Sequence, residues 1–145
     1  MLRVPPEAAW PGWGHASENP RLSIGLRATR SASQPNLPIV FIGPPAKPMH
    51  ALGDKIGSTI IAQSAGVPTI AWNGAGVTMN YKEVGEVTPE VYRRGQVLTA
   101  TECQSAAATI GFPVMIKASE GGGGKGIRMV HEPALVADAF RQVQV

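Results

Sequence analysis

Residues 112–128 read Phe-Pro-Val-Met-Ile-Lys-Ala-Ser-Glu-Gly-Gly-Gly-Gly-Lys-Gly-Ile-Arg, and this stretch decides the fold. The apolar run Val114–Ile116 predicts a buried strand, and Lys117 stands where that strand would emerge into a site. Gly121–Gly124 lack a Cβ, so several backbone N–H groups can converge on an anion, and Lys125 adds a point charge. We therefore predict a phosphate-binding loop rather than a flexible glycine-rich turn with solvated lysines.

Two better-known glycine motifs fail on this stretch. A P-loop requires Gly-Lys-Ser/Thr, but Gly126 follows Lys125, and Ser119 occupies the place of the first glycine. Three glycines of the run have the spacing of the dinucleotide-binding fingerprint, but that motif opens a helix, whereas residues 127–130 predict a strand. The loop is therefore predicted to be the tip of a hairpin between two strands.

This strand, loop and strand arrangement resembles the glycine-rich loop of ATP-grasp enzymes. Residues 112–126 are similar to the first signature of the biotin carboxylase and carbamoyl-phosphate synthetase group. The sequence of residues 115–128 resembles that of the biotin carboxylase domain of eukaryotic acetyl-CoA carboxylases. So does the sequence Gly-Trp-Gly-His-Ala-Ser-Glu-Asn-Pro at residues 12–20. The resemblance covers most of residues 10–144 and implies an α/β (α+β) fold, as a fragment of an ATP-grasp biotin carboxylase.

The resemblance also implies a division of the chain. Residues 1–9 form a ragged N-terminus without periodicity, and residues 10–47 correspond to the C-terminal part of the N-terminal, pre-ATP-grasp subdomain. Residues 48–145 correspond to an incomplete ATP-grasp domain, truncated at its C-terminus, whose first lobe carries the glycine-rich hairpin lid. In the family a helix leads into a strand at residues 21–38. The residues themselves turn polar and proline-broken there, which favours a loop insertion or a faulty stretch of sequence.

Local patterns predict the elements before the glycine loop. Residues 39–42 predict a short strand, and a helical pattern begins at Pro48 and is interrupted at Gly53. Asp54 is suited to cap a helix over residues 55–65, with Ile56, Ile60 and Ile61 on its core face. Three further elements are predicted, a strand over 69–72, a short helix over 89–94 and a helix that Thr101 and Gln104 cap and that Gly111 and Pro113 end.

The pattern after the loop predicts a strand at 127–130 and then a helix opened by Pro133. Its apolar stripe, which we interpret as core rather than a partner groove, consists of Leu135, Val136, Ala139, Phe140 and Val143.

Lys55 is the unusual residue of the helix that follows Asp54. A cation in the first turn opposes the helix dipole by a few tenths of a kcal/mol unless an anion shares the site. A bound phosphate would be such an anion. In the family, the lysine of Gly-Asp-Lys, here residues 53–55, contacts the phosphates of the nucleotide.

The resemblance implies a set of ATP-binding residues, namely Lys55, Lys117, Gly121, Gly122, Gly123, Gly124, Lys125 and Gly126. It implies an ATP-dependent ligase that carboxylates biotin with bicarbonate and leads to malonyl-CoA for fatty-acid synthesis. The cofactors would be ATP, Mg²⁺ or Mn²⁺ and, as carboxyl acceptor on another domain, biotin. The family's metal ligands and catalytic residues lie beyond residue 145, so none is assigned within this fragment and the chain alone is expected to be inactive.

The partners implied by the resemblance are ATP, bicarbonate and the biotinyl domain, in a full-length enzyme that forms a homodimer. Two alternatives stay open. One is another biotin-dependent carboxylase or ATP-grasp ligase, such as a pyruvate or propionyl-CoA carboxylase. The other is a non-catalytic, truncated product.

Composition narrows the class of protein. Thirteen basic against ten acidic residues give a formal net charge of +3, and no basic stripe alternates with aromatic residues, so nucleic acid is not a predicted partner. Cys103 is the one cysteine, which excludes an internal disulfide and favours a small buried side chain in a reducing compartment. No stretch reaches the length of a membrane span, and we expect a cytoplasmic protein, with an organellar form left open.

Overall fold

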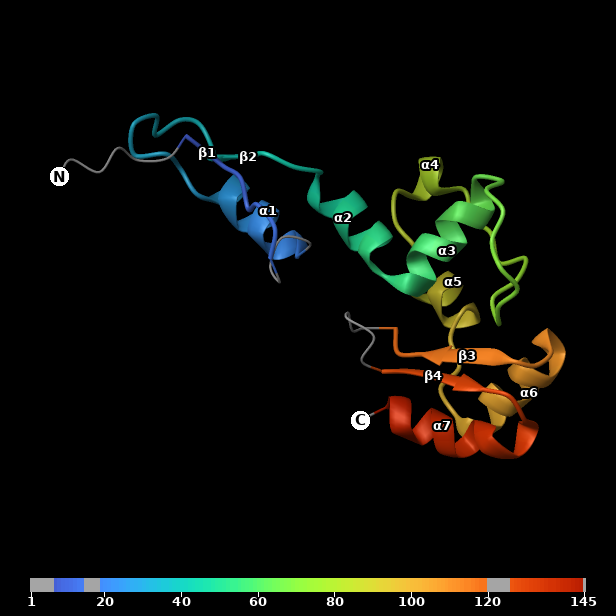
Figure 1. Cartoon of the computed structure of the whole chain (residues 1–145). Helices are drawn as coiled ribbons and strands as arrows, with labels where there is room; N and C mark the ends of the chain where they lie inside the picture. The colour runs from blue at the N-terminus through green and yellow to red at the C-terminus, as the bar shows by residue number, and fades with distance from the viewer. Residues whose placement is uncertain (1–6, 15–18, 120–125, 145) are drawn as a thin grey trace. The chain divides into compact units, whose positions relative to one another are not determined.

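A computed structural model describes residues 7–14, 19–119 and 126–144 of the chain. The chain divides into two compact units, Met1–Gly53 and Asp54–Val145, each of which has its own internal contacts (Figure 1). Helices and strands occur in both units, as the mixed fold class requires. The predicted subdomains, residues 10–47 and 48–145, stay a prediction.

The first unit is built around a short parallel strand pair. Strand β1 (Ala8–Ala9) pairs with β2 (Val40–Phe41), and helix α1 (Pro20–Ala28) lies between them in the sequence. Asn19 caps α1, because its Oδ1 accepts the backbone N–H of Arg21 at 3.0 Å. Helix α2 (Ala46–Gly53) follows β2 and packs against α1.

The structure bears on two predictions for this unit. Residues 8 and 9 are not ragged, because the N–H groups of Val40 and Ile42 donate to the carbonyl oxygens of Glu7 and Ala9 at 2.9 Å. A two-residue strand is too short to show periodicity, so only its partner reveals it. The helix that the resemblance implies within residues 21–38 is confirmed by α1, which ends at Ala28, so the alternative of a loop insertion applies at most to the residues after it.

The second unit begins with three helices. Helix α3 (Lys55–Ser64) is capped by Asp54 as predicted, and Ile60 is fully buried. Its predicted partners on the core face, Ile56 and Ile61, are half-buried. Helix α4 (Tyr81–Val84) shows no sequence pattern that predicts it, whereas α5 (Pro89–Arg94) has the predicted bounds.

The strand predicted at residues 69–72 does not form. Within the described part of the chain, no neighbouring strand offers this segment a ladder of hydrogen bonds. Gln63 of α3 holds it by its side chain instead, because Oε1 accepts from Trp72 Nε1 at 2.8 Å and from Thr69 Oγ1 at 3.3 Å. Residues 73–76 form a turn directly after this segment.

The rest of the second unit is a hairpin covered on one face by two helices. Strands β3 (Val114–Lys117) and β4 (Ile127–Val130) pair antiparallel, as predicted. Helix α6 (Ala100–Ile110) precedes them, and a 3₁₀ turn (Pro133–Leu135) leads into α7 (Val136–Val143). Figure 1 shows α6 and α7 on the same side of the hairpin. The core between them is apolar and consists of Cys103, Ala107, Val114, Ile116, Val130, Val136, Ala139, Phe140 and Val143.

Two details of these helices differ from the predictions. The cap of α6 is Thr99, whose Oγ1 accepts the N–H of Glu102 at 3.1 Å, so the Thr101 and Gln104 pairing is wrong by two residues. Both positions fit a capping pattern, and only the contacts of Glu102 decide between them. Leu135 is 52% exposed rather than in the core, because it lies in the 3₁₀ turn, where the helical period does not hold.

Candidate functional site

The first turn of α3 places a lysine beside a capped helix end. Asp54 Oδ1 accepts the backbone N–H of Gly57 at 2.7 Å, which satisfies one of the donors of that turn. The Asp54 carboxylate also puts an anion at the end of the helix where Lys55 carries its cation. The structure therefore supplies an anion within the protein itself at this helix end, which reduces the electrostatic penalty on Lys55.

Lys55 is directed at the segment that leaves β3. Its half-buried ammonium, Nζ, donates to the backbone carbonyl of Ser119 at 3.4 Å. Ser119 lies two residues after Lys117 and directly before the glycine run. Residues 64 positions apart in the sequence thus meet at the base of the predicted loop.

Lys117 lies on the opposite face of the hairpin from the core. Along β3 the burial alternates, so that Val114 and Ile116 face α6 and α7 while Met115 and Lys117 are exposed. The prediction of a strand buried over 114–116 is therefore correct for one face only. Met129 lies opposite Met115 and is 57% exposed, which makes this outer face apolar around the lysine. The alternation of buried and exposed residues could not be predicted from the sequence, because Val114, Met115 and Ile116 are all apolar.

Gly126 closes the described end of the loop. Its φ is +75°, and its carbonyl oxygen accepts the N–H of Ala118 at 2.9 Å. A Cβ at this position would lie 3.1 Å from the Cβ of Ala118, and the positive φ adds strain for any residue with a side chain. The remaining predicted loop residues, Gly121–Gly124 and Lys125, lie outside the described residues.

The comparisons with known proteins converge on one family. Residues 75–144 match the family model for the carbamoyl-phosphate synthase L chain, ATP binding domain. The chain is 52% identical over 138 residues to an acetyl-CoA carboxylase of Dictyostelium discoideum, covering 95% of this chain and 6% of that protein. A biotin carboxylase of Campylobacter jejuni, solved as a β-γ-ATP complex, superposes with a TM-score of 0.72 at 27% identity, covering 95% of this chain and 25% of the other.

The chain belongs to the biotin carboxylase family. It corresponds to the ATP-binding part of the biotin carboxylase component of acetyl-CoA carboxylases and spans about 6% of the length of the curated relatives it matches. Acetyl-CoA carboxylase 2 of Oryza sativa is likewise 52% identical over 138 residues, covering 94% of this chain. The biotin carboxylase domain of the Hydrogenobacter thermophilus 2-oxoglutarate carboxylase, solved with MgADP, ADP and bicarbonate, matches at 28% identity and a TM-score of 0.72, covering 94% of this chain and 24% of the other.

Other chemistry-bearing features of this biotin carboxylase segment lie away from the two lysines. Among residues 7–14, 19–119 and 126–144, no three His, Cys, Asp or Glu side chains come together as metal ligands, and no helix has the length and hydropathy of a membrane span. Cys103 is buried as predicted, and burial raises the pKa of its thiol. It lies in the core, so it is a packing residue rather than a nucleophile.

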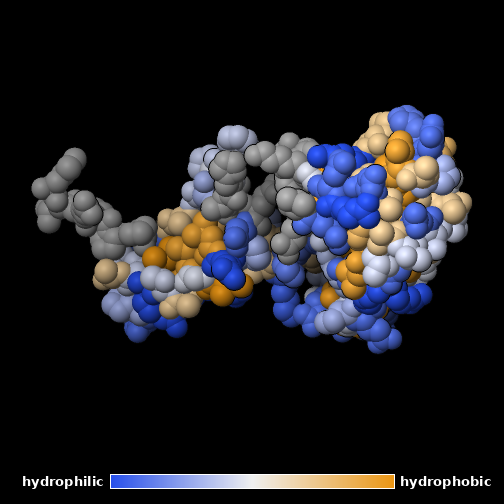
Figure 2. Space-filling model, turned by 90° about the horizontal axis from the view of Figure 1, so that it is seen from below, coloured by the Kyte–Doolittle hydropathy of each residue, from blue (hydrophilic) through white to orange (hydrophobic). Residues whose placement is uncertain are grey.

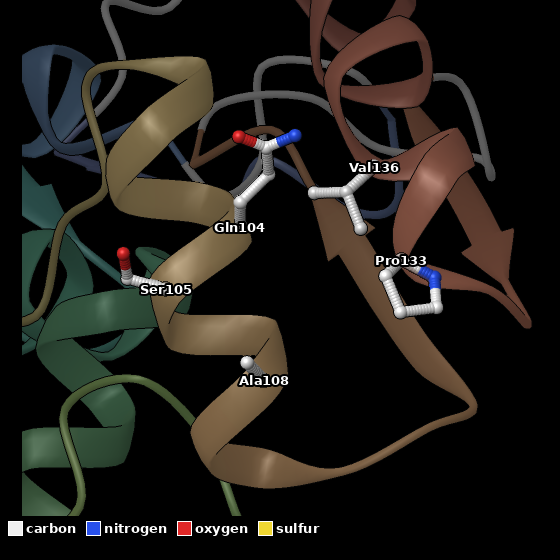
Figure 3. Close-up of a pocket in the computed structure, with 5 residues that line it drawn as sticks. All are labelled: Gln104, Ser105, Ala108, Pro133 and Val136. Atoms are coloured by element: carbon white, nitrogen blue, oxygen red, sulfur yellow. The ribbon is translucent and has the colours of Figure 1, made fainter.

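A shallow depression of ≈ 380 Å³ is separate from the lysines. Its lining comes from α6, from the 3₁₀ turn and from the first residue of α7 (Figure 3) and consists of Gln104, Ser105, Ala108, Pro133 and Val136. None of these five side chains is charged, and the two helices cover the opposite face of the hairpin from Lys117. The depression is therefore not part of an anion site.

Proposed function

We propose that this chain supplies phosphate-binding groups to the ATP site of the biotin carboxylase component of acetyl-CoA carboxylase. The observation that carries the proposal is the contact of Lys55 Nζ with the carbonyl of Ser119, 3.4 Å away. This contact supports a site in which a cation from α3 and a cation from the end of β3 serve the same polyanion.

The chemistry of the proposed site is electrostatic. ATP brings several negative charges into one place, and more charge develops on the oxygens of the phosphoryl group during transfer. Lys55 and Lys117 would hold the phosphates, and residues 121–126, with the charge of Lys125, would close over them and exclude water.

ATP-dependent carboxylation also requires a divalent metal, which neutralises phosphate charge when bound. Mg²⁺ prefers carboxylate and other oxygen ligands that converge on one point. The described residues bring no three such groups together, so they fit the phosphates and not the metal. We assign no step through Mg²⁺ or Mn²⁺ to this chain and expect the ligands elsewhere in the enzyme.

The reaction of the full-length enzyme is proposed from the family to which the chain belongs. The enzyme would use ATP and bicarbonate to carboxylate biotin on a biotinyl domain, and the carboxyl group would pass on to give malonyl-CoA for fatty-acid synthesis. A cytoplasmic homodimer is part of the same proposal. Bicarbonate is bound in the 2-oxoglutarate carboxylase domain named above, which is consistent with this substrate.

A pyruvate carboxylase is the second candidate. The pyruvate carboxylase of Rhizobium etli is 33% identical, with a TM-score of 0.58, and the acetyl-CoA carboxylases reach 52%. The higher identity favours acetyl-CoA carboxylase.

The test uses a complete acetyl-CoA carboxylase, that of Dictyostelium, with its matching segment replaced by this chain. We expect Lys55→Ala and Lys117→Ala each to weaken ATP binding about 10- to 100-fold, the usual loss for a hydrogen bond to a charged group. Lys82→Ala, at an exposed lysine of α4, is the matched control and should bind ATP normally. ATP binding that is unaffected by both site variants would contradict the proposal.

A further inference from the structure

Tyr92 of α5 makes a contact that neither the sequence patterns nor the proposed phosphate site accounts for. Its hydroxyl donates to Asp54 Oδ2 at 2.9 Å, over a separation of 38 residues. The other oxygen of the same carboxylate, Oδ1, accepts the N–H of Gly57. Asp54 is therefore held from two sides, by the helix that it caps and by the phenol of a second helix.

This arrangement bears on the position of Lys55 in the first turn of α3. A carboxylate with a single hydrogen bond can rotate about its side-chain torsions, whereas one held at both oxygens has one orientation. Lys55 follows Asp54 directly and starts the first turn of α3, and its Nζ reaches Ser119. The carboxylate that caps the helix next to this lysine is thus also the acceptor of the Tyr92 hydroxyl.

Two further contacts secure α5 beside α3. Gly95 ends α5, and a Cβ there would lie 2.7 Å from Cγ2 of Ile56, so only glycine permits the helices to come this close. The carbonyl of Gly95 also accepts from Asn73 Nδ2 at 2.6 Å. Tyr92 is therefore presented to Asp54 from a well-anchored helix.

Helix α5 also contacts α6, one of the two helices that cover the hairpin. Arg93, next to Tyr92, pairs with Glu102 of α6 at 2.9 Å, and α6 packs on β3 through Cys103 and Ala107. The pair is exposed and contributes little energy by itself. A continuous set of contacts therefore runs from the first turn of α3 through α5 and α6 to the strand that carries Lys117.

We propose that Tyr92 is a positioning residue of the ATP site, which acts through Asp54 to direct the ammonium of Lys55. This inference rests on the proposed role of Lys55 in phosphate binding. Because the proposed role of Tyr92 is exerted through Asp54, loss of its hydroxyl should change the affinity for ATP more than the rate of the chemical step.

The experiment uses Tyr92→Phe in the chimeric carboxylase described above. The ring and its packing remain, and only the hydroxyl is lost. We expect the KM for ATP to rise about three- to tenfold with kcat within about twofold, because a contact that binds ground state and transition state alike has been weakened. Tyr81→Phe removes the hydroxyl of the other tyrosine, in α4, and should leave both constants unchanged.

A double-mutant cycle with Lys55→Ala separates positioning from general stability. If Tyr92 acts through Lys55, Tyr92→Phe has no further effect on the KM for ATP once the lysine is gone. Effects that multiply in the double variant, or a KM that Tyr92→Phe leaves unchanged while Lys55→Ala raises it, would overturn the role of Tyr92 alone. A KM unchanged by Lys55→Ala would overturn the proposed function of the lysine and this inference together.

Discussion

At the scale of single residues, the reactivity of the Cys103 thiol measures whether the core of the second unit is packed. Its thiol is buried in α6, and burial raises its pKa, so the reactive thiolate is disfavoured in the folded chain. We expect DTNB to react with native protein at least ~10-fold more slowly than with protein in concentrated urea. The chain has one cysteine, so the absorbance change follows this site alone. Equal rates in both conditions would show that α6 is not packed on the hairpin.

Glu102 gives a pH-dependent prediction at the same scale. The backbone N–H of Leu98, and then the Arg93 guanidinium, lower the pKa of its carboxyl. Because the folded pKa lies below the unfolded value, the stabilisation is present above about pH 4.5 and is lost as the pH falls through the folded pKa.

We therefore expect Glu102→Gln to lower the Tm at pH 7 and to match the parent chain at low pH, as thermal unfolding by circular dichroism would show. Glu90→Gln is the control. It also removes a negative charge from the first turn of a helix, here α5, but Glu90 is exposed and does not make the contacts of Glu102 with Leu98 and Arg93. A Tm difference for Glu102→Gln that persists unchanged at low pH would contradict the assignment.

At the scale of elements, two positions five residues apart test where the core begins. Phe140 lies on the buried face of α7, whereas Leu135 is 52% exposed in the 3₁₀ turn before it. We expect Phe140→Ala to cost about 3–5 kcal/mol of unfolding free energy, through lost burial and a cavity. Leu135→Ala should change it by no more than about 0.5 kcal/mol. Urea denaturation distinguishes the two, and similar losses would mean that the stripe is buried as the sequence alone predicted.

The elements show why part of the fold could be predicted from the sequence. The α3 cap at Asp54, the bounds of α5 and the two strands of the hairpin depend on neighbours in the sequence, so local patterns find them. Strand β1 and the contact between Tyr92 and Asp54 join residues far apart, which no local pattern records. The segment 69–72 has strand-like composition, but in the described part of the chain it finds side-chain partners instead of a strand.

The site was predictable to the same extent. Lys55 and Lys117 were singled out because a helix start and a strand end are readable positions, and the family resemblance implies the phosphate-binding role that we propose for them. Met115 and Met129 were missed, since an apolar run does not reveal that one of its faces is open. The residues that orient Lys55 were missed because they act through tertiary contacts.

At the scale of the whole molecule, the first unit carries much exposed apolar surface, which Figure 2 shows as hydrophobic residues gathered on that unit. Its exposed large hydrophobic residues are Trp10, Trp13, Leu22, Ile24, Leu37, Val40, Ile42 and Leu52. Val40 and Ile42 alternate along the chain at β2, so they share one face of a parallel strand pair, a kind of sheet that proteins normally cover on both faces. Since the chain corresponds to about a quarter of the solved biotin carboxylase chains that it matches, we expect other parts of the domain to cover this face.

This surface leads to a prediction for the isolated chain. The 145-residue polypeptide should bind the dye ANS strongly and self-associate at high concentration, because a large apolar patch is exposed to water. Val40→Thr together with Ile42→Thr should lower the dye fluorescence more than Ile70→Thr does, although Ile70 in the second unit is 78% exposed, because the double substitution removes two apolar side chains from one face of the strand pair. The chimeric carboxylase, in which the rest of the domain is present, should show little dye binding. Strong fluorescence that persists in the chimera and is unaffected by the double substitution would mean that this face is not covered within the enzyme.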